Sequence, residues 1–424
     1  MNKNILSHSR EHTLDEWLSY LESLHSREID LGLTRINEVA QRLAIDLSFA
    51  QLITVAGTNG KGTTCAFIEQ VLLNSDKTIA VYSSPHIERF NERLRINKAD
   101  VADQAIINAF KKIEHARKEI SLSYYEYTTL AAFLVLMIER PAYIVLEVGL
   151  GGRLDATNII DADISVITTV DLDHQAFLGN DRETIAREKA GILRSNKTAI
   201  LGEASPAQSV LAYGQEINAN MVQREQDFFV TTNTDKTWSW KNSQNSFENL
   251  PLPHIPLDNV ATAISVLMHI LPEFSEQALV NSIQQTKVAG RTEHFKAMCD
   301  VVLDVGHNPL AARYLSQYVK QYLADNPSAK IHAVAAMLAD KDIQSTLVEL
   351  KHDIDAWYVA SLAVPRGANA EALAELLTQA KGSVNCFDKV EDAYKMALST
   401  AKSTDLLLVF GSFYTVSAIR KLLV

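Results

Sequence analysis

The sequence predicts an α/β protein with two domains: a P-loop-type domain on a mainly parallel sheet with a small antiparallel excursion, and a smaller Rossmann-like α/β domain at the C-terminus. Short apolar runs alternate with helical patterns along most of the chain, as they do in parallel α/β sheets. A glycine-rich loop follows the first of these runs. The 424 residues also exceed the size at which one hydrophobic core usually stops growing.

The first half of the chain opens with an amphipathic helix, because Thr13 and Glu16 have the spacing of a capping box and leucines with Trp17 then recur at helical spacing. Buried strands are expected at residues 52–56, 79–82, 143–148 and 164–169, with a helix at 102–119. The sequence pattern then changes to short runs of aromatic and β-branched residues interrupted by polar ones. This pattern favours an antiparallel excursion at 228–250 before a helix at 259–271.

A second alternating series predicts the C-terminal domain. Its strands are expected at residues 301–305, 331–337, 356–360 and 406–411, each separated by a helical pattern. The linker is placed near residues 287–298, so the predicted domains cover residues 1–290 and 291–424.

Composition excludes several classes of partner. The formal net charge of −11 argues against binding to nucleic acid, whose phosphate backbone attracts basic surfaces. The three cysteines are odd in number and far apart, which predicts neither disulfides nor a zinc site. The N-terminus lacks the apolar core of a signal peptide, and the longest apolar run, 130–138, is too short to span a bilayer. We therefore expect a cytoplasmic protein without a membrane partner. A monomer is expected as well, although nothing in the composition determines the oligomeric state.

The strongest local motif is G-T-N-G-K-G-T-T at residues 57–64, between a predicted strand and a predicted helix. Its backbone N–H groups can face a phosphate at the helix N-terminus, Lys61 can reach the terminal phosphates, and Thr63 or Thr64 can hold magnesium. The spacing before the lysine is shorter than in the common P-loop, and Gly62 follows it. The alternative is a glycine-rich turn without a ligand.

Three further turns at predicted strand ends carry metal-binding groups. They are S-S-P-H, which contains Ser84, the long turn that begins at Glu147, and D-L-D-H, which ends at His174. Ligands of open parallel sheets collect at the carboxyl ends of strands, so these groups could converge beside the phosphate loop and hold magnesium or manganese. Taken singly, His174 could be an ordinary turn histidine and Glu147 a helix cap.

Taken together, these motifs resemble the Mur ligase superfamily, and within it the folylpolyglutamate synthase and dihydrofolate synthase family, particularly the bacterial enzymes that perform both reactions. The resemblance covers nearly the whole chain. The motifs that carry it are I-D-L-G-L at 29–33, G-T-N-G-K-G-T-T at 57–64, Y-S-S-P-H at 82–86, Y-E-Y at 125–127, L-E-V-G-L-G-G-R-L-D-A-T-N at 146–158, R-E-K-A-G-I at 187–192, D-V-G-H-N-P at 304–309 and G-S-F-Y at 411–414.

The resemblance implies an ATP-dependent ligase with Mg²⁺, two ions being expected, held by the residues matching Ser84, Glu147 and His174. It implies that Lys189 is carbamylated (N6-carboxylysine) and that Lys61, Lys189 and His174 are catalytic, whereas without the resemblance Lys189 would be an ordinary helical lysine. The residues implied to bind ATP are Thr58, Asn59, Gly60, Lys61, Gly62, Thr63, Asn259, Arg291 and Asp304.

The substrates implied by the resemblance are dihydropteroate, tetrahydrofolate or related reduced folates, and L-glutamate, joined through an acyl phosphate. His307 and Ser412 match positions associated with glutamate. The one visible departure is Gly306, where alanine is expected. The residues implied to bind the pterin or folate are Ile29, Asp30, Leu31, Ser83, Ser123, Tyr124, Tyr125, Glu126, Leu154, Asp155 and Ala156.

Some alternatives stay open at this point. Asp155 could cap a helix that begins at Ala156, and Asn259, Arg291 and Asp304 could have core or capping roles. A rival enzyme is an amide ligase of the same superfamily that acts on a cell-wall precursor, although the stretch before Gly57 looks too short for its nucleotide-sugar recognition domain. A rival of another class is a nucleotide-controlled switch that hydrolyses ATP without ligation.

Overall fold

The computed structural model describes residues 11–25, 30–234 and 236–424, and the chain divides into two compact units. The N-terminal unit comprises residues 1–170 and 182–286, and the C-terminal unit comprises residues 171–181 and 287–424. The C-terminal unit is thus discontinuous in sequence, because the short segment 171–181 belongs to it. No helix in the described part of the chain combines the length and the apolar character needed to cross a membrane.

The N-terminal unit is built on an eight-stranded sheet in the order β4-β3-β2-β5-β1-β6-β7-β8. Strands β2, β5, β1, β6, β7 and β8 pair in parallel, and β3 and β4 pair antiparallel at one edge of the sheet. All four expected strands of this unit are present. The strands are β1 (Gln51–Ala56), β2 (Ile79–Tyr82), β3 (Leu94–Ile96), β4 (Ala99–Asp100), β5 (Tyr143–Glu147), β6 (Ile164–Ile167), β7 (Thr198–Leu201) and β8 (Asn220–Gln223).

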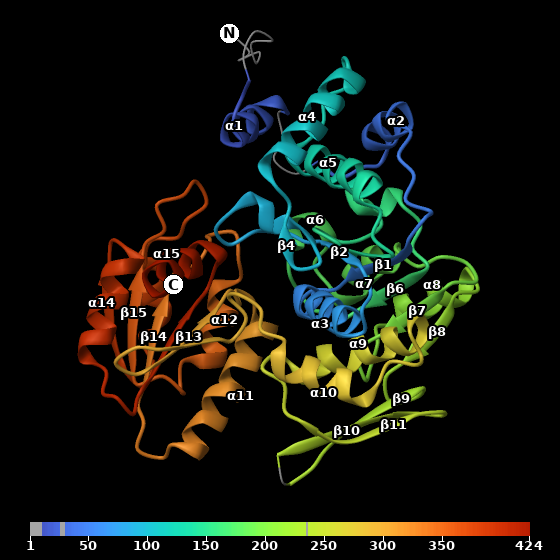
Figure 1. Cartoon of the computed structure of the whole chain (residues 1–424). Helices are drawn as coiled ribbons and strands as arrows, with labels where there is room; N and C mark the ends of the chain where they lie inside the picture. The colour runs from blue at the N-terminus through green and yellow to red at the C-terminus, as the bar shows by residue number, and fades with distance from the viewer. Residues whose placement is uncertain (1–10, 26–29, 235) are drawn as a thin grey trace. The chain divides into compact units, whose positions relative to one another are not determined.

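Helices cover both faces of this sheet (Figure 1). One layer packs its apolar side chains with those of β2 and β5, and it consists of α1 (Leu14–Leu24), α2 (Thr34–Arg42), α4 (Asp103–Arg117) and α5 (Tyr124–Glu139). The other layer consists of α3 (Lys61–Asn74), α9 (Leu257–Ile270) and α10 (Glu276–Gln285). The capping box predicted for the first helix is confirmed, since Glu16 N donates to Thr13 Oγ1 and Thr13 N donates to Glu16 Oε2.

The predicted antiparallel excursion is a three-stranded sheet of β9 (Phe228–Thr232), β10 (Thr237–Asn242) and β11 (Ser246–Pro251). Trp238 and Trp240 of the central strand are fully buried. Between β6 and this sheet lie α7 (Arg182–Ala190) and α8 (Gln208–Glu216), while the 3₁₀ turns η1 (Phe90–Arg93) and η2 (Ala156–Ile159) follow β2 and β5.

The C-terminal unit has a six-stranded sheet in the order β12-β13-β17-β14-β15-β16, parallel except for β12. The four strands expected here are confirmed as β13, β14, β15 and β17. The elements are β12 (Glu293–Lys296), β13 (Asp300–Asp304), β14 (Ile331–Ala335), β15 (Ala356–Ala360), β16 (Ser383–Phe387) and β17 (Leu406–Phe410), with α6 (Gln175–Leu178), α11 (Pro309–Asp325), α12 (Ile343–Leu350), α13 (Ala370–Leu376), α14 (Val390–Thr400) and α15 (Phe413–Leu423).

Candidate active site

The glycine-rich loop runs from the end of β1 to the first turn of α3, as the sequence predicts. Gly60 is the N-cap of α3 and has φ +85°, which L-residues rarely adopt. A Cβ atom at Gly57 would lie 1.9 Å from Thr168 Oγ1. Both glycines are therefore required by the local geometry, and together they aim the loop at the N-terminus of α3, where backbone N–H groups favour a phosphate.

The residues after β6 hold one side of this loop. The N–H groups of Thr58 and Asn59 donate to the carbonyl and the hydroxyl of Thr169, over 2.7 and 3.1 Å. In return, the Thr168 hydroxyl donates to the Asn59 carbonyl over 2.6 Å. Because β1 and β6 are neighbouring parallel strands, their carboxyl ends clamp the loop in one conformation.

Asn259 and Lys61 hold the other side. Asn259 of α9 donates from Nδ2 to Thr63 Oγ1 over 2.8 Å, and Thr63 Oγ1 donates to the Gly60 carbonyl over 3.0 Å. The Lys61 ammonium donates to two loop carbonyls, those of Gly57 at 2.9 Å and its neighbour at 3.3 Å. The structure thus brings together all the predicted nucleotide-binding residues of the N-terminal unit, including Asn259 from almost 200 positions further along the chain.

Glu147 is the last residue of β5, and Ser84 follows the carboxyl end of β2; in the sheet, β5 lies between β2 and β1. A Cβ atom at Gly62 would lie 3.6 Å from Glu147 Oε2, so this buried carboxylate lies against the first turn of α3. Hydroxyl and carboxylate oxygens are ligands that hard divalent cations prefer, and Ser84 and Glu147 therefore fit a magnesium site next to the phosphate loop. Within the described part of the chain, no three His, Cys, Asp or Glu side chains form a metal-holding group by themselves.

Lys189 lies on α7 and its side chain is buried. The turn that carries it packs closely on the turn after β5: Arg153 N donates to the Glu188 carbonyl over 2.7 Å, and a Cβ atom at Gly152 would lie 2.9 Å from the Lys189 carbonyl. The turn that follows Glu147 and the last turn of α7, which carries Lys189, are consequently joined by backbone contacts.

A network around Arg35 connects two of the residues that the family resemblance assigns to the folate. Arg35 of α2 bonds Asp30 Oδ2 over 2.8 Å and Glu126 Oε1 over 3.1 Å. Glu126 also forms a capping box with Ser123 at the start of α5. Sequence reasoning missed Arg35, since nothing in the local pattern links it to residues 91 positions away. Ile29, another predicted folate residue, lies outside the described residues.

Asp155 does act as a cap, which was the structural alternative. Its Oδ1 accepts from the Thr157 N–H over 2.9 Å and the Thr157 hydroxyl over 2.7 Å, and its Oδ2 accepts from the Leu150 N–H over 2.9 Å. Burial raises the pKa of Asp155, and these hydrogen bonds partly offset that rise. The flanking Leu154 is half-buried and Ala156 is buried.

Several aromatic rings pack around the predicted folate residues Tyr124 and Tyr125. Tyr125 stacks on Tyr82, with ring centroids 6.3 Å apart, and the Arg93 guanidinium lies 5.6 Å from the ring centroid of both Phe90 and Tyr124. The Arg93 carbonyl accepts from the N–H of Ser83, over 2.8 Å. Arg93 was not predicted, because its position over two rings depends on the antiparallel return of β3. Leu31 is half-buried and follows Asp30 directly.

In the C-terminal unit, the predicted residues also gather at strand ends. Asp304 ends β13, and its carboxylate accepts from the N–H groups of Thr292 and Gly306 over 2.8 and 2.7 Å. Burial raises the pKa of Asp304, and the nearby Arg291 partly offsets the rise. The Arg291 guanidinium lies 5.6 Å from the ring centroid of Phe413 at the start of α15.

Ser412 and His307 follow β17 and β13, which are neighbours in the sheet. Ser412 is the N-cap of α15: its Oγ accepts from the Thr415 N–H over 3.0 Å. His307 Nδ1 lies 2.8 Å from the Val305 carbonyl, and since a carbonyl only accepts, Nδ1 carries the hydrogen. A Cβ atom at Gly306 would lie 2.9 Å from both Asp304 Oδ1 and Ala311 Cβ, so this departure from the family pattern fits tight local packing.

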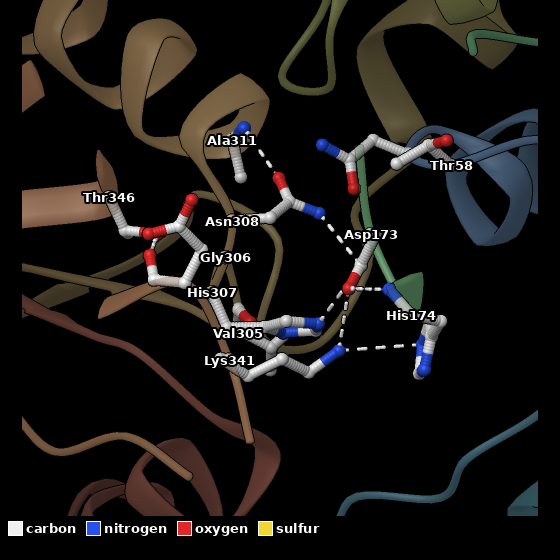
Figure 2. Close-up of polar contacts among 12 residues, drawn as sticks. Thr58, Asp173, His174, Val305, Gly306, His307, Asn308, Ala311, Lys341 and Thr346 are labelled. Carbon is white, nitrogen blue, oxygen red and sulfur yellow. Dashed lines mark hydrogen bonds and ion pairs between the residues drawn. The ribbon is translucent and has the colours of Figure 1, made fainter. Parts of the chain in front are cut away.

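His174 lies on the segment 171–181 of the C-terminal unit, next to Asp173. Figure 2 shows Asp173 at the centre of polar contacts with Lys341, Asn308 and His307. Burial raises the pKa of Asp173, but His307 and Lys341 outweigh this effect and hold the pKa below its usual range, so the carboxylate is ionised. Lys341 was not among the predicted residues. Its position after the carboxyl end of β14 was the available signal.

Two family models match the chain: the Mur ligase middle domain over residues 55–267 and the Mur ligase glutamate ligase domain over residues 290–413. A dihydrofolate synthase/folylpolyglutamate synthase of Escherichia coli (strain K12) is 44% identical over 97% of this chain and 95% of its own length. The corresponding protein of Haemophilus influenzae is 40% identical over 95% of this chain and 96% of its own length.

Solved structures agree with these sequence matches. The E. coli FolC complex with DHPP and ADP superposes with a TM-score of 0.92 at 44% identity, covering 97% of each chain. A bifunctional folylpolyglutamate synthase/dihydrofolate synthase from Yersinia pestis, complexed with AMPPNP and Mn ion, has a TM-score of 0.91 at 41% identity, covering 97% of this chain and 98% of its own. The chain therefore belongs to the Mur ligase family, within its dihydrofolate synthase/folylpolyglutamate synthase group.

Proposed function

We propose that this protein is an ATP-dependent amide ligase that adds L-glutamate to dihydropteroate, forming dihydrofolate, and to reduced folates, forming polyglutamates. The observation that carries this proposal is the clamped phosphate loop, with Lys61 in it and Glu147 against its helix, in a chain that matches a Mur ligase middle domain followed by a glutamate ligase domain.

The reaction requires activation of a carboxylate. Expelling oxide from a free carboxylate is prohibitively difficult, so the γ-phosphoryl group of ATP is first transferred to the carboxylate, which becomes an acyl phosphate. The protein's part in this step is to position both groups and to neutralise charge. The loop N–H groups and Lys61 serve this purpose, since they meet the phosphates with donors that are already oriented.

Magnesium, for which we expect two ions, would add positive charge beside the phosphates, with Ser84, Glu147 and His174 as its protein ligands. The neutral amine of glutamate then attacks the acyl phosphate, and the amide forms as phosphate leaves. We assign Arg291 and Asp304 to the nucleotide and the sites of His307 and Ser412 to the incoming glutamate. The expected cytoplasmic location and monomeric state stay predictions from the sequence.

The folate pocket that we propose follows the family assignment. Ser83, the capped start of α5 from Ser123 to Glu126, and the turn from Leu154 to Ala156 lie in the same unit as the phosphate loop. The Arg35 network fixes Asp30 relative to α5. Because the buried oxygens of Asp155 already accept hydrogen bonds, its role toward the pterin is to shape the turn that meets it as well as to offer remaining acceptor capacity.

The deciding experiment is an ADP-release assay with dihydropteroate or tetrahydrofolate, with and without L-glutamate, followed by product mass. We expect ADP formation to depend on both substrates and the product to gain one glutamate. ADP formation that ignores glutamate would favour the switch protein instead.

Lys61→Ala should lower ligation at least roughly 10²-fold with the fold intact, because one oriented electrostatic donor is lost. Lys77→Ala is the matched control, since Lys77 is an exposed lysine of the same unit just beyond α3. Near-normal ligation by a folded Lys61→Ala protein would remove Lys61 from the active site.

For Lys189 we propose a carbamate, formed when CO₂ adds to the neutral side-chain amine. Its burial beside the Glu147 turn supports this assignment because the modified group would be shielded from bulk water. ¹³C NMR of protein equilibrated with ¹³C-labelled bicarbonate should show one carbamate signal that is missing from Lys189→Ala. A spectrum identical in the two proteins would contradict the modification, and a short carboxylate in solution should partly restore Lys189→Ala activity.

A further inference from the structure

The segment 171–181 contacts the rest of the C-terminal unit through Asp171, which pairs with Arg313, and through Asp173. Asp173 Oδ1 accepts from the Lys341 ammonium over 2.8 Å, and Oδ2 accepts from Asn308 Nδ2 over 3.0 Å. His307 Nε2 lies 3.6 Å from Oδ2. The Lys341 and Asp173 side chains are only 8% and 10% exposed, so this is a buried ion pair with hydrogen bonds on both oxygens.

The two partners of Asp173 are themselves fixed. Asn308 is the N-cap of α11, where its Oδ1 accepts from the Ala311 N–H over 2.9 Å. A carboxylate only accepts and an N–H only donates, so the orientation of the Asn308 amide is determined by its two neighbours. Lys341 follows β14 and therefore comes from a different strand end of the same sheet. The two oxygens of Asp173 are thus bound by side chains from two different places in the sheet, the start of α11 and the segment after β14.

The same carboxylate controls the backbone of the next residue. Asp173 Oδ1 accepts from the His174 N–H over 2.8 Å, and His174 has φ +52°, in the left-handed region. That conformation is unfavourable for an L-residue and persists only where neighbouring contacts enforce it. Lys341 Nζ also lies 3.4 Å from His174 Nε2, and Figure 2 shows the imidazole on the side of Asp173 that faces Lys341.

We propose that Asp173 and Lys341 are positioning residues for His174: the ion pair locks the left-handed turn and thereby sets the direction of the imidazole that the proposed function assigns to the metal. The glutamate ligase domain, through Lys341 and Asn308, thus controls a metal ligand of the ATP reaction. This inference rests on the proposed metal role of His174, so the experiment measures metal binding separately from ligation.

The experiment is a double-mutant cycle on Mn²⁺ affinity, measured by electron paramagnetic resonance with a non-hydrolysable ATP analogue and without folate or glutamate. Lys341→Met should weaken Mn²⁺ binding about 10- to 100-fold, the usual effect of removing a group that orients a metal ligand. His174→Ala should weaken it at least as much. In the His174→Ala background, Lys341→Met should cause no further loss, because Lys341 acts only through His174.

Several outcomes would overturn the inference. If Lys341→Met weakens Mn²⁺ binding equally in both backgrounds, Lys341 does not act through His174. If it leaves Mn²⁺ binding unchanged and raises only the KM for glutamate, Lys341 is a substrate contact. If His174→Ala itself leaves Mn²⁺ binding unchanged, the metal role of His174 fails, and nothing remains to be positioned, although glutamate-dependent ADP release would still support the ligase.

Lys381→Met is the control, because Lys381 forms an ion pair over 2.9 Å with Asp355 in the same unit, at the amino end of β15, whereas Lys341 follows the carboxyl end of the neighbouring parallel strand β14. Its Mn²⁺ affinity should equal that of the unmodified protein. Lys341→Gln provides a second variant if Lys341→Met does not fold. This variant keeps a hydrogen-bond donor for Asp173 but not the positive charge. Its Mn²⁺ affinity is expected to lie between that of the Lys341→Met variant and that of the unmodified protein. Affinity equal to the control would contradict the role of the ion pair.

Discussion

At Gly60 two constraints meet on one residue. The backbone has φ +85°, and a Cβ atom would lie 2.4 Å from Asn259 Oδ1. Gly62, two positions later, has neither constraint: a Cβ atom there would meet Glu147 at an ordinary contact distance of 3.6 Å or more. The first glycine is therefore required by both the backbone conformation and the steric contact with Asn259, whereas the local geometry does not require a glycine at position 62.

We predict that Gly60→Ala and Gly62→Ala change the local stability of α3 in opposite directions. Gly60→Ala should lower the free energy of opening by about 1–2 kcal/mol or more, from the left-handed strain and the displaced Asn259. Gly62→Ala should raise it by up to about 1 kcal/mol, since alanine favours the helix. Hydrogen exchange of the α3 amides measures both. Equal effects of the same sign would contradict the separate roles.

Two strands and a helix of the C-terminal unit are tied together by Asp405, at the start of β17. Its Oδ1 accepts from the Lys330 N–H at the start of β14 over 3.0 Å, and its Oδ2 accepts from the Lys402 N–H after α14 over 2.8 Å. His332 Nε2 of β14 lies 3.3 Å from Oδ2. Although burial raises the pKa of Asp405, these hydrogen bonds and His332 outweigh it and lower the pKa below its usual value.

Asp405→Asn should therefore destabilise the protein by about 1–3 kcal/mol at pH 7, because buried donors lose an ionised acceptor. A depressed carboxyl pKa contributes stability above the unfolded value of about 3.9, and that contribution is lost as the pH falls through the folded pKa. The urea midpoints of the two proteins should differ at pH 7 and converge below about pH 4. A difference that is independent of pH would mean that the charge of Asp405 does not matter.

At the scale of the whole molecule, one phosphate loop is expected to serve both ligations, because the acceptors differ only in whether the reacting carboxylate belongs to dihydropteroate or to the terminal glutamate of a folate. We predict that dihydropteroate competes with tetrahydrofolate, with an inhibition constant equal to its own KM. Product mass spectrometry of mixed-substrate reactions measures this. Additive rates in the mixture would indicate two independent sites.

Local patterns were sufficient for much of the architecture. Some features depend only on residues that are close together in the chain, so they can be predicted without the fold. They are the capping box at Thr13, the central parallel strands and the loop around Lys61. Edge strands such as β8 and β16 were not predicted, because their side chains are mostly half-buried or exposed and lack the continuous apolar run of a central strand.

The sequence by itself determined the two-domain α/β fold, the phosphate loop and its strand-end neighbours, since each rests on periodicity or on a short motif. Only the tertiary structure decided three contacts. Arg35 bonds both Asp30 and Glu126, and the Asp155 carboxylate accepts hydrogen bonds from its own turn. Lys341 forms an ion pair with Asp173 of segment 171–181. The physical reason is sequence distance: Lys341 and Asp173 are 168 positions apart, and only the packing of strand ends makes such a pair neighbours.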